Sequence, residues 1–142
     1  MAEYIDGIVD TLGNNLELVD TQARTDIAQI NNSLTKKTTT LTVPNNQYSV
    51  VSYNQVEKSG NIVIVRFGGN LSSTIAGLNA LIATLPEGYR PSSTAEVQIF
   101  TNYAQTTPSI YHATIYTDGT IKTNIGGSTV SDRMYINVMF CI

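Results

Sequence analysis

Charged residues are scarce in this chain of 142 residues, because Asp, Glu, Lys and Arg together make up 13% of it. About a quarter is usual for a soluble protein. The formal net charge is −3 at pH 7, with eight Lys and Arg in all. Binding to nucleic-acid phosphates or to anionic lipid depends on clustered positive charge. We therefore expect neither nucleic acid nor a membrane among the partners of this protein.

Cysteine is nearly absent as well, since Cys141 is the single one. One cysteine excludes a disulfide within the chain and a thiolate metal cluster. No apolar run approaches the roughly eighteen residues of a membrane span, and the first residues lack the basic and apolar regions of a secretory signal. We expect a soluble protein that is made in the cytoplasm, carries no cofactor, and is stabilised by packing and assembly.

Catalytic motifs are also missing. The sequence contains no Gly-x-Ser-x-Gly elbow, no phosphate-binding loop and no Cys–His pair at a plausible spacing. The acids of residues 47–142 are Glu57, Glu87, Glu96, Asp118 and Asp132. Two of these five could in principle face each other as a glycosidase pair. Most of them fall at expected turns, and Trp, a common sugar platform, is absent. We therefore expect that the protein is not an enzyme.

What the sequence does contain is a row of apolar residues with coiled-coil spacing near its start. After Ala23 the row gains one extra four-residue step, a stutter that shifts the seam without ending it. A helix with one narrow apolar stripe usually buries it against copies of itself. We predict a self-associating helical stalk over residues 1–34, with a seam at Ile5, Val9, Leu12, Leu16, Val19, Ala23, Ile27, Ile30 and Leu34.

Two features of this stalk leave alternatives open. Gly7 and Gly13 each disfavour a helix by roughly 1 kcal/mol relative to Ala, so the first turns depend on packing between chains. The seam mixes residue types and does not choose a strand number. A helix that docks on its own domain is the alternative to self-association.

The pattern changes after the stalk. Residues 35–46 are rich in β-branched side chains and include Pro44, which predicts an extended linker or neck. Apolar and polar residues then alternate between closely spaced turn signals, which is typical of an all-β domain. We predict a mainly β head over residues 47–142, an antiparallel, jelly-roll-like β-sandwich. Its expected strands are residues 48–58, 62–71, 95–102, 110–117, 120–124 and 133–142.

Details within the head sharpen this prediction. Asp118-Gly119 is the strongest hairpin signal in the chain. Residues 74–85 are ambiguous between helix and strand, and we predict a loop or turn that leads into a strand at 81–85. Residues 62–67 and 133–142 are apolar on both faces, whereas a lone sandwich keeps one face wet. We therefore predict that the head contributes an interface of its own to the oligomer.

Two short motifs in the head carry a resemblance. Residues 83–91 read Ala-Thr-Leu-Pro-Glu-Gly-Tyr-Arg-Pro, and residues 113–122 read Ala-Thr-Ile-Tyr-Thr-Asp-Gly-Thr-Ile-Lys. Together with the closing apolar strand, they resemble the C-terminal head domains of bacteriophage tail fibre and baseplate receptor-binding proteins. The resemblance covers roughly residues 47–142, and the helical start is similar to the stalk or shoulder of the same proteins.

The resemblance implies a homotrimer whose head, at the tip of a phage tail, binds a host cell-surface carbohydrate. It also implies a virion component that is made in the bacterial cytoplasm and attaches through its N-terminus to other tail or baseplate proteins. A purely structural tail subunit and a polysaccharide depolymerase are the alternatives. The turn at residues 85–91 has a physical interpretation of its own as a rigid corner.

The candidate carbohydrate-binding residues carry polar or aromatic side chains near expected strand ends. Tyr offers an apolar ring and a hydroxyl at low entropic cost, so we predict that Tyr103 stacks on a sugar. The full set is Asn102, Tyr103, Gln105, His112, Asp118, Asp132 and Arg133. His112 is the single His and alternates with Ile110 and Thr114 on one strand face. Three copies of His112 could meet in a trimer, but such a residue is more often hydrogen-bonded, and we predict no metal site.

Overall fold

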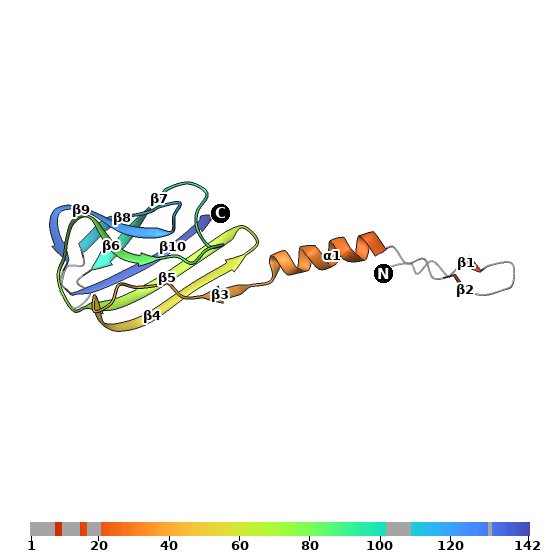
Figure 1. Cartoon of the computed structure of the whole chain (residues 1–142), viewed down its shortest axis with the longest axis horizontal. Coiled ribbons are helices and arrows are strands. Elements are labelled where there is room, and N and C mark those ends of the chain that lie inside the picture. The colour runs from red at the N-terminus through yellow and green to blue at the C-terminus, as the bar shows by residue number, and fades with distance from the viewer. Residues whose placement is uncertain (1–7, 10–14, 17–20, 102–108, 131) are drawn as a thin grey trace. The chain divides into compact units, whose positions relative to one another are not determined.

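The computed structural model describes residues 8–9, 15–16, 21–101, 109–130 and 132–142 of the chain (Figure 1). Contacts within the chain divide it into two compact units, Met1–Leu34 and Thr35–Ile142. The first unit contains strands β1 (Ile8–Val9) and β2 (Asn15–Leu16), which pair antiparallel, and helix α1 (Thr21–Leu34).

Helix α1 is 14 residues long and carries an exposed apolar stripe. Ile27, Ile30 and Leu34 are separated by three and four residues, so they share one side of the helix. Their exposed fractions are 58%, 56% and 60%. A helix of this length is marginal on its own in water, so its stability depends on burying that stripe.

The helical stalk predicted over residues 1–34 is wrong at Val9 and Leu16, which lie in β1 and β2. β-Branched residues favour extended backbone, and Gly7 and Gly13 each oppose a helix by roughly 1 kcal/mol. Of the predicted seam, Ala23, Ile27, Ile30 and Leu34 lie on α1. Ile5, Leu12 and Val19 lie outside the described residues.

The second unit is a single antiparallel sheet of eight strands in the order β3-β4-β5-β10-β7-β8-β9-β6 (Figure 1). The strands are β3 (Lys37–Thr39), β4 (Tyr48–Ser59), β5 (Ile62–Leu71), β6 (Ile75–Thr84), β7 (Ala95–Thr101), β8 (Ser109–Ile115), β9 (Thr120–Val130) and β10 (Arg133–Cys141).

This sheet curls until its two ends meet. Thr42, just beyond β3, bridges to Thr84 at the end of β6 through two backbone hydrogen bonds of 2.9 and 2.8 Å. At the start of β4, the hydroxyl of Tyr48 donates to the carbonyl oxygen of Ile82 on β6 at 3.2 Å. The curled sheet therefore has an inner face that holds the core and an outer face that meets solvent.

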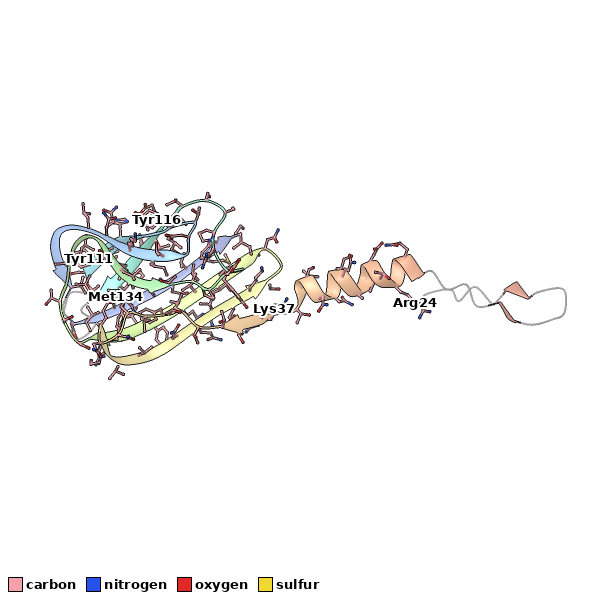
Figure 2. All side chains as sticks on the ribbon, in the orientation of Figure 1. Arg24, Lys37, Tyr111, Tyr116 and Met134 are labelled. Atoms are coloured by element: carbon pink, nitrogen blue, oxygen red, sulfur yellow. The ribbon has the colours of Figure 1, made fainter. Side chains whose placement is uncertain are left out.

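Alternation along the strands fills the core. On β5, Val65 and Phe67 are fully buried, and on the neighbouring β10 Met134 and Ile136 are fully buried. Met134 is labelled in Figure 2. Burying each such side chain contributes roughly 1.5–3 kcal/mol. The ring of Tyr48 packs edge-on against Phe67 at 5.1 Å, and burial raises the pKa of Tyr48.

Strand β6 occupies most of the segment that the sequence left ambiguous. Gly77 and Asn79 adopt left-handed backbone, with φ of 76° and 64°, and the register of β6 with β9 shifts on both sides of Leu78. The two residues that interrupt a helical pattern thus form bulges within a strand. The loop predicted before Leu81 is wrong, because pairing with β9 begins at Ile75.

The mainly β, antiparallel head is confirmed, and so is the hairpin at Asp118-Gly119, which joins β8 to β9. Strand β9 continues to Val130, beyond the predicted end at residue 124. The described strands of the head form one continuous hydrogen-bonded sheet, whereas the predicted sandwich has two separate sheets. Alternating polarity reports only that one strand face is buried, and it does not distinguish a curled sheet from two stacked sheets.

Candidate functional site

A cleft of about 310 Å³ lies on the outer face of the sheet, over β7, β8, β9 and β6. This volume is at the lower end of the range for small-molecule sites, which is roughly 300–1,000 Å³. Hydroxyl and amide groups dominate the lining, with one carboxylate and one tyrosine ring. The lining residues are Leu78, Asn79, Thr94, Glu96, Thr114, Tyr116, Thr123 and Asn124.

The bulged part of β6 forms one wall of the cleft, and Thr123 on β9 fixes it in place. The hydroxyl of Thr123 donates to the carbonyl oxygen of Gly77 at 2.9 Å and accepts a hydrogen bond from the backbone N–H of Ala80 at 3.0 Å. Thr123 is only 2% exposed, so water competes little for these bonds. They hold both ends of the segment that carries Leu78 and Asn79.

Cross-strand contacts form the floor. Thr114 on β8 lies opposite Glu96 on β7, and its hydroxyl donates to Glu96 Oε1 at 2.9 Å. The hydroxyl of Tyr116 donates to Asn79 Oδ1 at 3.4 Å. The ammonium group of Lys122 lies 5.2 Å from the centre of the Tyr116 ring, a cation–π contact that orients the ring. Tyr116 is labelled at the surface of the sheet in Figure 2.

These groups have the chemistry to bind a polyhydroxylated ligand. A carboxylate accepts hydrogen bonds from several hydroxyls, and an Asn amide both donates and accepts. A tyrosine ring offers an apolar surface to the C–H face of a sugar. Glycoside hydrolysis commonly uses two carboxylates, and the residues that line this cleft include a single one, Glu96.

Those predicted residues that the structure describes lie at different places on the sheet. Asp118 lies in the turn before β9, where its carboxylate accepts hydrogen bonds from the backbone N–H and the hydroxyl of Thr120 at 2.8 and 2.7 Å. These two bonds hold the pKa of the Asp118 carboxyl below its ordinary value, and the bond from the backbone N–H has the larger effect. Asp132 and Arg133 lie at the opposite end of β9, where the carbonyl oxygen of Asp132 accepts from the N–H of Leu71 at 2.8 Å.

His112 comes nearest to the cleft among the predicted residues. It is exposed on β8 and lies opposite Asn124, which lines the cleft, and opposite Gln98 on β7. Asn102, Tyr103 and Gln105 fall outside the described residues. Within one chain, His112 therefore lies apart from the turn of Asp118 and from Asp132 at the far end of β9.

The predicted carbohydrate-binding set included none of the residues that line the cleft, namely Leu78, Asn79, Thr94, Glu96, Thr114, Tyr116, Thr123 and Asn124. A weak signal was present, because Glu96 and Thr114 alternate with apolar residues on two strands and so share the outer face. The pairing of β6 with β9 was not visible, because it depends on bulges at Gly77 and Asn79.

Within the described ranges, no group of three or more His, Cys, Asp and Glu side chains is placed to hold a metal ion. In the same ranges, no helix has the length and apolar character needed to cross a membrane.

Protein-family models and curated proteins gave no match to this chain. Among solved structures, the crystal structure of the receptor binding protein (gp15) of Listeria phage PSA is similar, with a TM-score of 0.52 and 19% sequence identity. The match covers 92% of this chain and 84% of that chain. At this identity the similarity shows a shared fold.

Proposed function

We propose that this chain is a receptor-binding protein of a bacteriophage tail, which attaches the virion to a saccharide on the bacterial surface. The observation that carries the proposal is the polar cleft, in which Glu96, Asn124 and Tyr116 present a carboxylate, an amide and an aromatic ring. The fold shared with a phage receptor-binding protein supports the same function. The protein would then be a virion component whose N-terminus attaches to other tail or baseplate proteins.

The chemistry of the lining supports binding without cleavage. Glu96 accepts one hydrogen bond from Thr114 and keeps a second carboxylate oxygen for ligand hydroxyls. Tyr116 supplies the stacking surface, with its ring held by Lys122. His112 borders the cleft and extends the polar surface toward β7. Among the described residues that line the cleft, Glu96 is the one carboxylate, whereas hydrolysis commonly uses two.

We also propose that three copies associate through the apolar stripe of α1. Ile27, Ile30 and Leu34 are exposed in the single chain, and packing them against copies of the same helix removes that surface from water. Three joined heads let weak individual saccharide contacts act together, since the second and third binding events become intramolecular.

The direct test is binding of the purified chain to a panel of bacterial wall polysaccharides and whole cells, with blocking of phage adsorption as a second readout. Glu96→Gln keeps an acceptor for Thr114 but removes the charge, so we expect saccharide affinity to fall about tenfold, or 1.4 kcal/mol. Glu87→Gln, in an exposed turn, is the matched control and should bind as the wild type does.

Two other functions predict different results. A structural tail subunit would bind no saccharide and no cell in the panel, and its variants would not differ. A depolymerase would release reducing ends from a polysaccharide that it binds, and Glu96→Gln would abolish that release. Binding with no release, lowered by Glu96→Gln alone, is the result that supports attachment.

A further inference from the structure

The outer face of β7, β8 and β9 continues beyond the cleft as a row of polar side chains. Gln98 lies opposite His112, and His112 lies opposite Asn124. All three are exposed and alternate with residues that face inward, so they point away from the core. Asn124 also lines the cleft. The polar row therefore begins where the cleft ends.

An exposed aromatic ring follows the polar row along the same strands. Phe100 is the next outward residue of β7 after Gln98, and it lies opposite Ile110 on β8. Phe100 is 41% exposed and Ile110 is 55% exposed. The outer face of β7 thus carries a carboxylate, an amide and an aromatic ring in order, from Glu96 to Phe100.

The polar groups of this row are available to a ligand. Within the described part of the chain, the side chains of Gln98, His112 and Asn124 form no hydrogen bond or ion pair. An amide donates and accepts, and a neutral imidazole has one donor and one acceptor nitrogen. A ligand can therefore bind these groups without breaking a bond within the chain.

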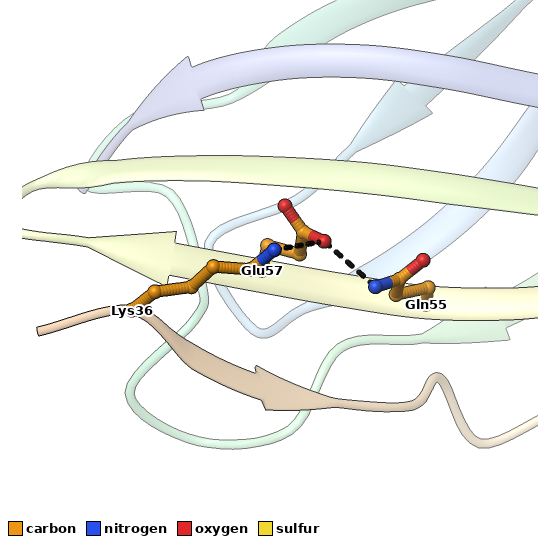
Figure 3. Close-up of polar contacts among 3 residues, drawn as sticks. All are labelled: Lys36, Gln55 and Glu57. Carbon is orange, nitrogen blue, oxygen red and sulfur yellow. Dashed lines mark hydrogen bonds and ion pairs between the residues drawn. The ribbon is translucent and has the colours of Figure 1, made fainter.

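The outer face of β4 and β10 differs, because its groups bind one another. Glu57 on β4 forms an ion pair with Lys36 at 2.8 Å and accepts a hydrogen bond from Gln55 at 2.7 Å (Figure 3). The rings of Tyr53 and Tyr135 are stacked, with centroids 5.9 Å apart. These side chains already have partners within the chain, so the row beside the cleft is the better candidate for a ligand.

We propose that the cleft is one part of a longer site, which holds a chain of several sugars along β7 and β8 from Glu96 to Phe100. This inference rests on the proposed function and adds that the receptor is a polymer segment. Alternate residues of a strand lie about 6.8 Å apart, so Glu96 and Phe100 are roughly 14 Å apart. A ligand that contacts both residues is longer than a single sugar ring.

Each part of this surface matches a feature of a sugar chain. Sugar hydroxyls donate and accept hydrogen bonds, and so do the amides of Gln98 and Asn124. The ring of Phe100 offers an apolar surface to the C–H face of a sugar. A single sugar in the cleft would leave both Phe100 and Gln98 in water, whereas a chain of sugars uses them.

The test uses the full chain and the wall polysaccharide that it binds in the panel, cut by partial acid hydrolysis and separated by length. By isothermal titration calorimetry, we expect the longer fragments to bind at least about tenfold more tightly than the single sugars, or 1.4 kcal/mol. Phe100→Leu and Gln98→Ala should remove most of this gain. They should leave single-sugar binding unchanged, because neither residue lines the cleft.

Met139→Ala is the matched control, since it truncates an apolar side chain that is 67% exposed on β10. It should keep the full gain with length. Sedimentation velocity on the same variants reports whether a protein partner covers the surface instead.

The outcomes are separable. A gain with length that Phe100→Leu and Gln98→Ala remove supports the longer site. Equal affinity for all lengths, or a gain that survives both substitutions, overturns the longer site and leaves attachment through the cleft intact. Substitutions that change the sedimentation coefficient but not the length series overturn it in favour of a protein contact. If no polysaccharide of the panel binds, the proposed function fails and the longer site fails with it.

Discussion

The backbones of Leu85 and Gly119 are in direct contact, although 34 positions separate them in the sequence. The N–H of Leu85 donates to the carbonyl oxygen of Gly119 at 2.8 Å. Arg90 Nε donates to the carbonyl oxygen of Leu85 at 3.4 Å. The turn at residues 85–91 and the hairpin at Asp118-Gly119 therefore form one corner of the head.

Gly119→Ala should destabilise the head strongly. Gly119 has a φ of 87°, and a Cβ there would lie 2.7 Å from the carbonyl oxygen of Leu85. We expect a loss of roughly 2–4 kcal/mol, which combines left-handed strain with a backbone clash. Gly88→Ala is the control, because its φ of 82° carries the strain with nothing within 4 Å of the new atom. Urea denaturation of both variants measures the difference; equal losses would contradict the close approach.

Gly68→Ala should separate the stacked tyrosines. The added methyl group needs the space now filled by Tyr53 and Tyr135, so we expect a cost of roughly 1–3 kcal/mol and a changed near-ultraviolet circular dichroism spectrum. In the Tyr53→Ala, Tyr135→Ala background the same substitution should cost much less. Additive effects in this cycle would show that the rings do not press on Gly68.

Thr123→Val should loosen the wall of the cleft. Valine matches the shape of threonine but leaves the N–H of Ala80 and the carbonyl oxygen of Gly77 without their partner. Losing these buried hydrogen bonds costs roughly 1–3 kcal/mol, and saccharide binding should weaken with it. Thr123→Ser keeps the hydroxyl and should keep binding. Hydrogen exchange of the Ala80 amide measures the loosening, and unchanged protection in the Val variant would contradict it.

Asp118 should make stability depend on acid pH. Its pKa is lowered in the folded state by hydrogen bonds from Thr120, so the ionised carboxylate stabilises the fold above its unfolded pKa of about 3.9. This contribution is lost as pH falls through the lower, folded pKa. Thermal unfolding between pH 6 and pH 2.5, at roughly half-unit steps around that reference value, should show a shallower decline for Asp118→Asn than for wild type. Parallel curves would mean that the bonds to Thr120 do not favour the charged form.

The fold was predictable where local signals and tertiary structure agree. The apolar runs of β5 and β10 located two strands, and the Asp-Gly pair located the hairpin, because both signals depend on residues close in sequence. Closure of the sheet through Thr42 and Thr84 was not predictable, since one bridge between distant residues leaves no pattern in either segment.

The candidate site was harder to predict for the same reason. Glu96, Thr114 and Asn124 come from three strands and meet only through their register. Asp118 was predicted to bind carbohydrate because it is a polar residue near a strand end. Its carboxylate instead accepts hydrogen bonds from Thr120, and these bonds stabilise the turn. The sequence alone therefore does not tell whether a polar residue at a strand end binds a ligand or stabilises a turn; its hydrogen-bond partners decide this.

Ile30→Lys should dissociate the proposed trimer without unfolding the head. Ile30 is 56% exposed on α1 within one chain, so a charge at this position costs little in the single chain. When copies pack together, the same charge would be buried without a partner, which costs several kcal/mol. Asn32→Lys adds the same charge about 200° further round the helix and should leave the mass unchanged. We expect sedimentation equilibrium to report a trimer for Asn32→Lys and a monomer for Ile30→Lys, with unchanged far-ultraviolet circular dichroism of the sheet. Loss of avidity should then weaken adhesion to whole cells by roughly 10²-fold or more, while binding of a soluble oligosaccharide to each head stays the same. A trimer that survives Ile30→Lys would mean that the stripe of α1 does not hold the copies together.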